Sequence, residues 1–222
     1  MSSVEERLRQ VRDRITAACR RSGRDQNEVK LLAVSKLQPA GLIREAWETG
    51  QRDFGENYAQ ELRDKVTALA DLEGLRWHAI GPLQTNKAKY VAASAWAFHA
   101  LDRIEIASEL SKRRKGPPLR CFLEVNVGGE ASKSGIAPAD AAKLLEAVRP
   151  LPNLEVVGVM SLPPPVENPE DARPYFRELR ALAARLGLPE LSMGTTADFE
   201  VAIEEGAHWV RVGTAIFGER PR

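Results

Sequence analysis

The chain has 222 residues, with 32 basic and 31 acidic side chains and a formal net charge of +1. This balance argues against binding to nucleic acid or to a membrane surface through bulk charge. Hydrophobic residues make up 43% of the chain and charged residues 28%, which is typical of a soluble globular protein and excludes a disordered or fibrous one.

The first residues are charged throughout and lack the apolar core of a secretion signal, so we expect a cytoplasmic protein. No apolar run approaches the roughly 18 residues that are needed to span a bilayer. The two cysteines, Cys19 and Cys121, are far apart and form no Cys-x-x-Cys or Cys/His cluster. We therefore expect free thiols and no metal site.

Apolar residues at helical spacing open the chain at residues 3–22. From there, strand-like apolar runs alternate with helical patterns. Strands are expected at residues 30–35, 53–57, 75–81, 96–101, 120–127, 154–161, 191–194 and 209–213. Helices are expected between them at 39–50, 58–69, 85–93, 102–114, 138–148, 169–187 and 197–206, with a final turn at 214–219.

Eight strands that alternate with helices have the order that a parallel α/β sheet requires. Eight such units in about 200 residues predict a (β/α)8 TIM barrel with an extra N-terminal helix. We expect one domain over residues 1–222, because no linker or composition shift divides the chain. A doubly wound open sheet is the alternative, but it would more typically carry a Gly-x-Gly-x-x-Gly loop after its first strand, which this chain lacks.

The ligand site of a parallel barrel lies at the carboxyl ends of its strands, so the residues that follow each apolar run are the candidates. Lys36 comes directly after the run LLAVS. A lysine at the barrel mouth beside apolar walls would have a lowered pKa, which suits attack on a carbonyl carbon. A solvated loop lysine is the alternative that its position leaves open.

A second group of candidates follows the last two strands. Arg211, Gly213 and Thr214 form an Arg-x-Gly-Thr run at a position where barrels often bind phosphate through loop amides. The preceding unit ends in two threonines, Thr195 and Thr196, whose hydroxyls suit the same task. Helix capping is the alternative there, because residues 195–198 have the Thr-x-x-Asp spacing of a capping box. A cap and an anion site can coexist at one helix start.

Other polar residues carry weaker signals. The histidines show no metal spacing, and we interpret His78 and His99, which lie within strands, as hydrogen-bonded barrel residues rather than bases. The basic run at 112–115 closes a helix, where cations compensate the helix dipole. Lys133, in the glycine-containing loop 126–135, either binds an anion or belongs to a mobile lid.

Five ordered blocks carry a recognisable pattern: LLAVSK at 31–36, FGENYAQE at 54–61, WHAIGPLQTNK at 77–87, SKSGI at 132–136 and MGTTADFEVAIEEGAHWVRVGTAIFGER at 193–220. Together they resemble the YggS/PROSC family, the pyridoxal 5′-phosphate (PLP) homeostasis proteins. The resemblance covers essentially the whole chain. It implies a barrel related to the N-terminal domain of alanine racemase, with PLP held as a Schiff base.

The resemblance also implies roles for residues around the cofactor ring. Lys36 matches the lysine that forms the Schiff base, and Arg211 matches the arginine that faces the pyridine nitrogen. Asn57 and His78 match residues that line the pocket. An arginine beside the pyridine nitrogen keeps that nitrogen unprotonated, which makes the ring a weaker electron sink.

At the phosphate end, Thr196 occupies the usual serine position of the family, and Gly213 and Thr214 match its phosphate-binding turn. One departure is visible, because the family commonly reads MGMS where this chain reads MGTT at 193–196. Thr195 therefore replaces a methionine. Threonine for serine at position 196 keeps the hydroxyl, so we expect phosphate binding to be retained.

The resemblance implies a non-catalytic protein that binds PLP and related B6 vitamers, with PLP-dependent apo-enzymes as candidate partners. A near-neutral surface and a full barrel are compatible with a monomer, which we expect. A PLP-dependent amino-acid racemase that uses Lys36 is the alternative. The related racemases take a second base from an additional domain and a partner subunit, and this chain ends at Arg222, straight after the barrel. A barrel that binds another phosphorylated metabolite without a Schiff base is a third candidate.

Overall fold

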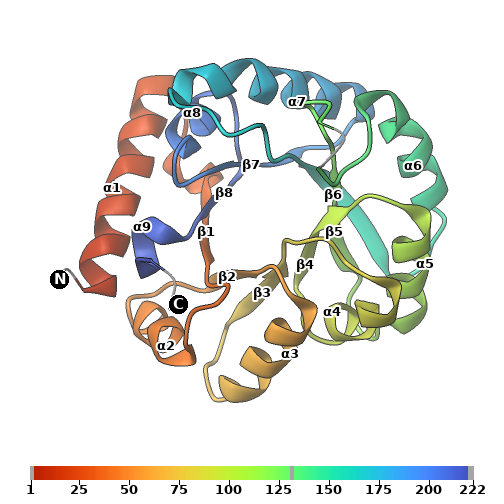
Figure 1. Ribbon diagram of the computed structural model, residues 1–222, viewed down its shortest axis with the longest axis horizontal. Helices are drawn as coiled ribbons and strands as arrows, with labels where there is room; N and C mark the ends of the chain where they lie inside the picture. Colours follow the sequence, from red (N-terminus) through yellow and green to blue (C-terminus); the bar gives the residue numbers. More distant parts are fainter. Residues whose placement is uncertain (1–2, 131–132, 220–222) are drawn as a thin grey trace.

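The structure is a computed structural model that describes residues 3–130 and 133–219. Its eight strands are all parallel and close into a barrel, because each pairs with the next and β8 pairs with β1. Figure 1 shows the strands enclosed by a ring of helices. The strands are β1 (Lys30–Val34), β2 (Asp53–Glu56), β3 (Arg76–Ala79), β4 (Ala97–Leu101), β5 (Leu119–Glu124), β6 (Leu154–Met160), β7 (Glu190–Thr195) and β8 (Trp209–Val212). The predicted (β/α)8 barrel is confirmed.

The helices follow the strands as the sequence predicts. They are α1 (Val4–Ser22), α2 (Ala40–Glu48), α3 (Ala59–Ala68), α4 (Ala88–Ser94), α5 (Ile104–Arg113), α6 (Ala141–Val148), α7 (Arg173–Leu186), α8 (Phe199–Glu204) and α9 (Thr214–Phe217). Two details differ from expectation. The final turn is the short helix α9, and one turn of 3₁₀ helix precedes each of α4, α6 and α7, at Thr85–Lys87, Pro138–Asp140 and Pro169–Ala172.

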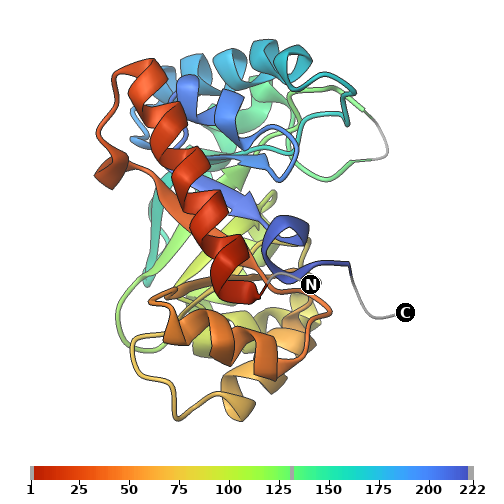
Figure 2. The same cartoon turned by 90° about the vertical axis from the view of Figure 1, so that its left-hand side faces the viewer.

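The extra N-terminal helix, α1, lies across the outside of the barrel, where it packs against α2, α8 and α9 (Figure 2). It begins with a capping box in which Glu6 N donates to Ser3 Oγ and Ser3 N donates to Glu6 Oε2, both at 3.1 Å. Its buried stripe includes Leu8, Val11 and Ile15. Burial of this stripe accounts for the position of α1 over the β8–β1 side of the barrel.

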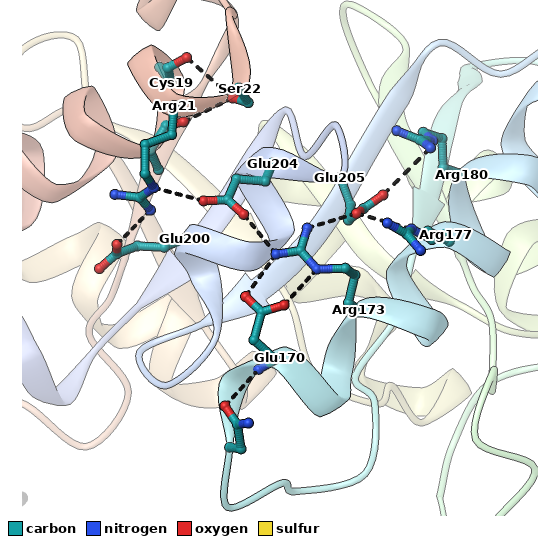
Figure 3. Close-up of polar contacts among 12 residues, drawn as sticks. Cys19, Arg21, Ser22, Glu170, Arg173, Arg177, Arg180, Glu200, Glu204 and Glu205 are labelled. Carbon is teal, nitrogen blue, oxygen red and sulfur yellow. Dashed lines mark hydrogen bonds and ion pairs between the residues drawn. The ribbon is translucent and has the colours of Figure 1, made fainter.

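Charged side chains hold α8 between α1 and α7 (Figure 3). Glu204 accepts hydrogen bonds from Arg21 of α1 at 2.9 Å and from Arg173 of α7 at 2.8 Å. Glu205, whose side chain is only 5% exposed, contacts Arg173 at 2.8 Å and Arg177 at 3.1 Å. This network fixes the helix that follows the carboxyl end of β7.

The interior of the barrel holds aromatic rings and polar side chains. The ring centroids of His78 and His99 lie 4.9 and 6.1 Å from that of Trp209, and His99 stacks on Phe122 at 4.2 Å. Asp53 lies 3.0 Å from His78 and Ser192 lies 2.9 Å from His99, so a polar column runs through the centre of the barrel.

Both cysteines are free thiols, as predicted, and both are buried. Burial raises the pKa of the Cys121 thiol to about 12, so this sulfur is protonated and unreactive at neutral pH. In the part of the chain that the structure describes, no helix is both long and apolar enough to cross a membrane.

Candidate functional site

A cavity of about 310 Å³ opens at the carboxyl ends of the strands. Its volume lies at the lower end of the range for small-molecule sites, roughly 300–1,000 Å³. Six of the seven sequence-predicted site residues line it: Lys36, Asn57, Thr196, Arg211, Gly213 and Thr214. Side chains from β1, β2, β7 and β8 thus meet around one cavity, although they lie up to 178 positions apart, from Lys36 to Thr214.

The loop that carries Lys36 turns sharply after β1. Ser35 N donates to the Gly55 carbonyl at 3.0 Å, and Gln38 N donates back to the Ser35 carbonyl at the same distance. Leu37 has a φ of 60°, in the left-handed region that non-glycine residues rarely adopt. Its amide donates to Glu61 Oε1 at 2.6 Å. This unusual backbone, held from α3, places Lys36 at the cavity wall.

Lys65, a buried residue of α3, holds this loop through its ammonium group. Its ammonium donates to the Ser35 carbonyl at 2.6 Å, to Glu61 Oε1 at 2.7 Å and to Glu56 Oε1 at 2.8 Å. The three N–H groups of the ammonium therefore meet three oxygen atoms. Burial raises the pKa of Glu56 to about 7, although Lys65 and the Ser35 hydroxyl both favour its charged form.

The opposite wall of the cavity is built by the loop between β7 and α8 and by the turn after β8. Gly213 N donates to Thr196 Oγ1 at 3.3 Å and so joins the two segments. Gly194 has a φ of 89°, and a Cβ there would stand 2.5 Å from Ala202 Cβ and 2.9 Å from Phe199 Cα. Only glycine lets the end of β7 approach α8 this closely. Thr196, Gly213 and Thr214 consequently face one end of the cavity.

The capping box expected at Thr195 and Asp198 forms only in part. Asp198 Oδ1 accepts from the Thr195 amide at 2.6 Å and from the Thr195 hydroxyl at 3.0 Å. Helix α8 begins later, at Phe199, and the side chain of its N-cap residue, Asp198, makes no capping hydrogen bond. The Thr195 hydroxyl therefore ties the loop to Asp198 instead of capping a helix, and both threonines still line the cavity.

Arg211 lines the cavity from inside the barrel and is 4% exposed. Its Nη1 donates to the Ser192 carbonyl at 2.7 Å and to Ser192 Oγ at 2.8 Å, and its Nη2 donates to the Ser161 carbonyl at 2.8 Å. Burial lowers its pKa to about 10, while Asp198 and Glu124 act in the opposite direction. The guanidinium thus remains charged at neutral pH and is held rigidly by neighbouring strands.

Asn57 offers an acceptor to the cavity. Its Oδ1 is buried and has no hydrogen-bond partner within residues 3–130 and 133–219. The backbone of Asn57 lies against Gly81, where a Cβ would stand 2.4 Å from the Asn57 carbonyl oxygen, so only glycine permits this approach. A buried, unsatisfied acceptor is costly unless a ligand or solvent donates to it.

His78 differs from the expectation that it lines the cavity. It lies one layer deeper, fully buried in the barrel interior, with Nε2 3.0 Å from Asp53 Oδ1 and Nδ1 2.9 Å from His99 Nε2. It points inward from the middle of β3, whereas the cavity is reached at the strand ends. The interpretation of both histidines as hydrogen-bonded barrel residues is confirmed.

The remaining predictions lie outside the cavity. Lys133 pairs with Glu130 Oε2 at 2.6 Å and donates to the Pro163 carbonyl at 3.1 Å, and two residues of its loop, 131–132, lie outside the described residues. The basic run at 112–115 does close α5, as expected. Among the residues described, no His/Cys/Asp/Glu group that could hold a metal ion is present.

Sequence reasoning missed several residues that complete the site. Val34, Gln38, Ile80 and Leu162 also line the cavity. Each follows or ends a strand, which is a signal that could have found them. Lys65 carries no such signal, because it stands in a charged helix and its burial depends on partners from other elements.

Comparison with known proteins agrees with this geometry. The family model of the alanine racemase N-terminal domain matches residues 7–221. A pyridoxal phosphate homeostasis protein of Aquifex aeolicus is 49% identical, over 97% of each chain. Another, from Pseudomonas aeruginosa, is 50% identical over 99% of this chain and 97% of that one.

Among solved structures, PipY of Synechococcus elongatus with PLP bound superposes with a TM-score of 0.85 and 35% identity, covering 97% of this chain and all of that one. The sequence relatives and this structure share the full length of the barrel described above. This chain therefore belongs to the family of the alanine racemase N-terminal domain and, within it, to the pyridoxal phosphate homeostasis proteins.

Proposed function

We propose that this protein binds pyridoxal 5′-phosphate as a Schiff base on Lys36 and takes part in intracellular PLP homeostasis, without strong catalytic activity of its own. The observation that carries the proposal is the meeting of Lys36, Arg211 and the Thr196–Gly213 pair around one cavity. A lysine, a rigid cation and a set of hydroxyl and amide donors match an aldehyde, a ring nitrogen and a phosphate.

The phosphate end fits the donors present. Because Thr196 Oγ1 accepts from Gly213 N, its hydroxyl hydrogen can point to a different acceptor. Thr214 stands at the first turn of α9, and a Cβ on Gly213 would stand 3.1 Å from the Val34 carbonyl oxygen, so glycine lets this turn approach β1. In our proposal Thr196, Gly213 and Thr214 bind the phosphate, the two hydroxyls as donors and the glycine as the turn that brings them together.

The ring end is held by Arg211, with Asn57 at the side of the cavity. When bound, the cofactor supplies an aldehyde that a lysine amine converts to a Schiff base with loss of water, and a pyridine ring that accepts electrons. A guanidinium opposite the ring nitrogen repels a second positive charge there, so it disfavours protonation of that nitrogen. Arg211 thereby favours holding the cofactor over carbanion chemistry.

An amino-acid racemase with Lys36 as its base is the alternative, and such an enzyme also needs a second base on the opposite face of the cofactor ring. We further propose a single domain over residues 1–222, a cytoplasmic monomer, and delivery to or exchange with PLP-dependent apo-enzymes. His78, which lies beneath the cavity, would act on the cofactor through other side chains. Light scattering at micromolar concentration tests the monomer, and a dimer mass would contradict it.

Absorbance titration tests the binding proposal. A visible band should rise with added PLP and saturate at one equivalent, and inorganic phosphate should compete only weakly. Saturable binding without a visible band would favour the phosphorylated-metabolite alternative. Chiral analysis of alanine and serine after long incubation with the loaded protein should show no conversion, whereas enantiomer formation that requires Lys36 would establish the racemase.

A further inference from the structure

Five side chains form a continuous hydrogen-bonded chain through the barrel interior, from the amino end of β2 to the cavity. Asp53 Oδ1 lies 3.0 Å from His78 Nε2, and His78 Nδ1 lies 2.9 Å from His99 Nε2. His99 Nδ1 lies 2.9 Å from Ser192 Oγ, which lies 2.8 Å from Arg211 Nη1. All five side chains are buried, and both imidazoles are completely so.

The two ends of this interior chain, together with neutral histidines, set the direction of every bond in it. Arg211 can only donate, and a carboxylate can only accept. Although burial disfavours the charge, hydrogen bonds from His78 and Arg76 hold the pKa of Asp53 below its ordinary value, so it is a carboxylate. Ser192 Oγ accepts from Arg211, and when both imidazoles are neutral the carboxylate end requires Ser192 to donate to His99. Each histidine then accepts at Nδ1 and donates from Nε2.

Neutral histidines are required for this arrangement, since an imidazolium has no acceptor nitrogen. Burial lowers the pKa of His78, and burial together with the neighbouring His78 lowers the pKa of His99 well below its ordinary value. Asp53 acts in the opposite direction on His78, and Arg76 and Arg120 act with burial. Both rings are accordingly neutral at physiological pH, and one tautomer of each completes the interior chain.

The negative charge of Asp53, at the other end of the interior chain, matters because Arg211 is a buried cation. The hydrogen bonds described for Arg211 go to Ser192 and Ser161, and no ion pair to it occurs within residues 3–130 and 133–219. Hydrogen bonds that all point the same way polarise one another in a low-dielectric interior. The anionic Asp53 is thereby linked to the guanidinium through three intervening side chains.

We propose that Asp53, His78, His99 and Ser192 are positioning residues that fix the orientation of the Arg211 guanidinium toward the ring nitrogen of the bound cofactor. This inference rests on the proposed function, because it takes the partner of Arg211 to be a pyridine nitrogen. The interior chain removes the freedom of the guanidinium to rotate away when the cavity fills. It thus contributes to selection of a ligand with an acceptor at that position.

Nitrogen-15 NMR of the histidine side chains tests the interior chain in the protein without ligand. Both His78 and His99 should show the neutral tautomer with hydrogen on Nε2 at pH 7. Asp53→Ala should broaden or shift the nitrogen-15 signals of both rings, because His78 Nε2 loses its fixed acceptor. A hydrogen on Nδ1 of either ring, or an imidazolium at pH 7, would overturn the proposed bond direction whether or not the protein binds PLP.

A ligand pair tests the positioning role. PLP and its 1-deaza analogue differ only at the ring position that Arg211 faces in the proposal. Wild-type protein should prefer PLP, and Ser192→Ala should reduce this preference about tenfold, as expected for weakening one charge-assisted hydrogen bond. The measurement is the dissociation constant of the 1-deaza analogue divided by that of PLP. A general loss of packing weakens the binding of both ligands and therefore cancels in this ratio.

Further variants separate positioning from structure. Ser111→Ala removes another buried hydroxyl, which donates to the Pro152 carbonyl outside the barrel interior, and should leave the ratio unchanged. His99→Phe keeps a ring to stack on Phe122 and should lower the ratio like Ser192→Ala. The double variant should lower it no further, because both changes break the same interior chain.

The outcomes distinguish the two proposals. An unchanged ratio in folded Ser192→Ala and His99→Phe, with PLP still bound, would overturn the positioning role alone. Equal loss in Ser111→Ala would assign the effect to packing and would also overturn it. If wild-type protein binds neither ligand, the proposed function fails and the positioning role fails with it.

Discussion

Lys65 Nζ donates a 2.6 Å hydrogen bond to the backbone carbonyl of Ser35, the residue directly before Lys36. The same ammonium contacts Glu56 at the end of β2 and Glu61 on its own helix. One buried cation therefore joins α3, β2 and the loop that follows β1. This contact is the structural reason that the Lys36 loop can hold a positive φ at Leu37.

Lys65→Met should lower the free energy of unfolding by about 3 kcal/mol, because it leaves two carboxylates near each other without their shared cation. Affinity for PLP should fall as well, since the Lys36 loop loses its support. Urea denaturation and absorbance titration measure the two effects. Arg63→Met on the same helix, which breaks an exposed pair with Asp64, should cost less than about 1 kcal/mol. Equal costs for both variants would contradict the role of Lys65.

The raised pKa of Glu56 makes a prediction about pH. In the folded protein this carboxyl has a pKa of about 7, above its ordinary value of 4.5, so the folded state binds the proton more tightly. The resulting stabilisation is complete below pH 4.5 and is lost as the pH rises through 7. Glu56→Gln should remove a slope of up to about 1.4 kcal/mol per pH unit in that window. Parallel stability curves for wild type and variant would contradict the prediction.

The phosphate site predicts a strong preference between vitamers. Pyridoxal should bind at least about a hundredfold more weakly than PLP, a difference of about 2.7 kcal/mol, because several donors lose their acceptor together. Thr196→Ala combined with Thr214→Val should reduce that preference and leave the visible band intact. Thr67→Val combined with Thr85→Ala, at exposed positions, serves as the control. Equal affinities for the two vitamers in wild type would mean that the phosphate site is misplaced.

The ion pairs around α8 predict a stability effect that depends on burial. Glu205→Gln should lower the free energy of unfolding by about 1–3 kcal/mol, because Arg173, Arg177 and Arg180 all lose a buried partner. Glu170→Gln removes a 57% exposed partner of the same Arg173 and should cost less than about 1 kcal/mol. Chemical denaturation in low salt compares them. A larger loss in Glu170→Gln would contradict the importance of the buried carboxylate.

Much of the fold follows from the sequence, because parallel barrel strands are buried and short and each stands between helical patterns. The eight strands and the helix at residues 3–22 appear where the apolar spacing predicts them. The segment at 214–219 was harder, since four helical residues such as those of α9 have no period that separates them from a turn.

The sequence predicts the site residues whose location depends on their position relative to a strand end. It does not predict those whose location depends on packing between distant segments. Lys36 follows β1 and Arg211 lies one residue before the end of β8, so the sequence predicts both at the mouth, and both line the cavity. His78 stands in the middle of a strand, and its depth follows from contacts with Asp53 and His99 on other strands. No pattern within one segment reveals such contacts, and the same holds for the burial of Lys65.

The central claim is that Lys36 carries the cofactor covalently, and peptide mass spectrometry after borohydride reduction tests it most directly. The reduced cofactor should be found on the peptide that contains Lys36. Labelling should disappear in a folded Lys36→Ala variant and persist in Lys112→Ala, which changes a lysine in the last turn of α5. Labelling of wild-type protein at Lys133 or at any other lysine, with Lys36 unmodified, would contradict the account.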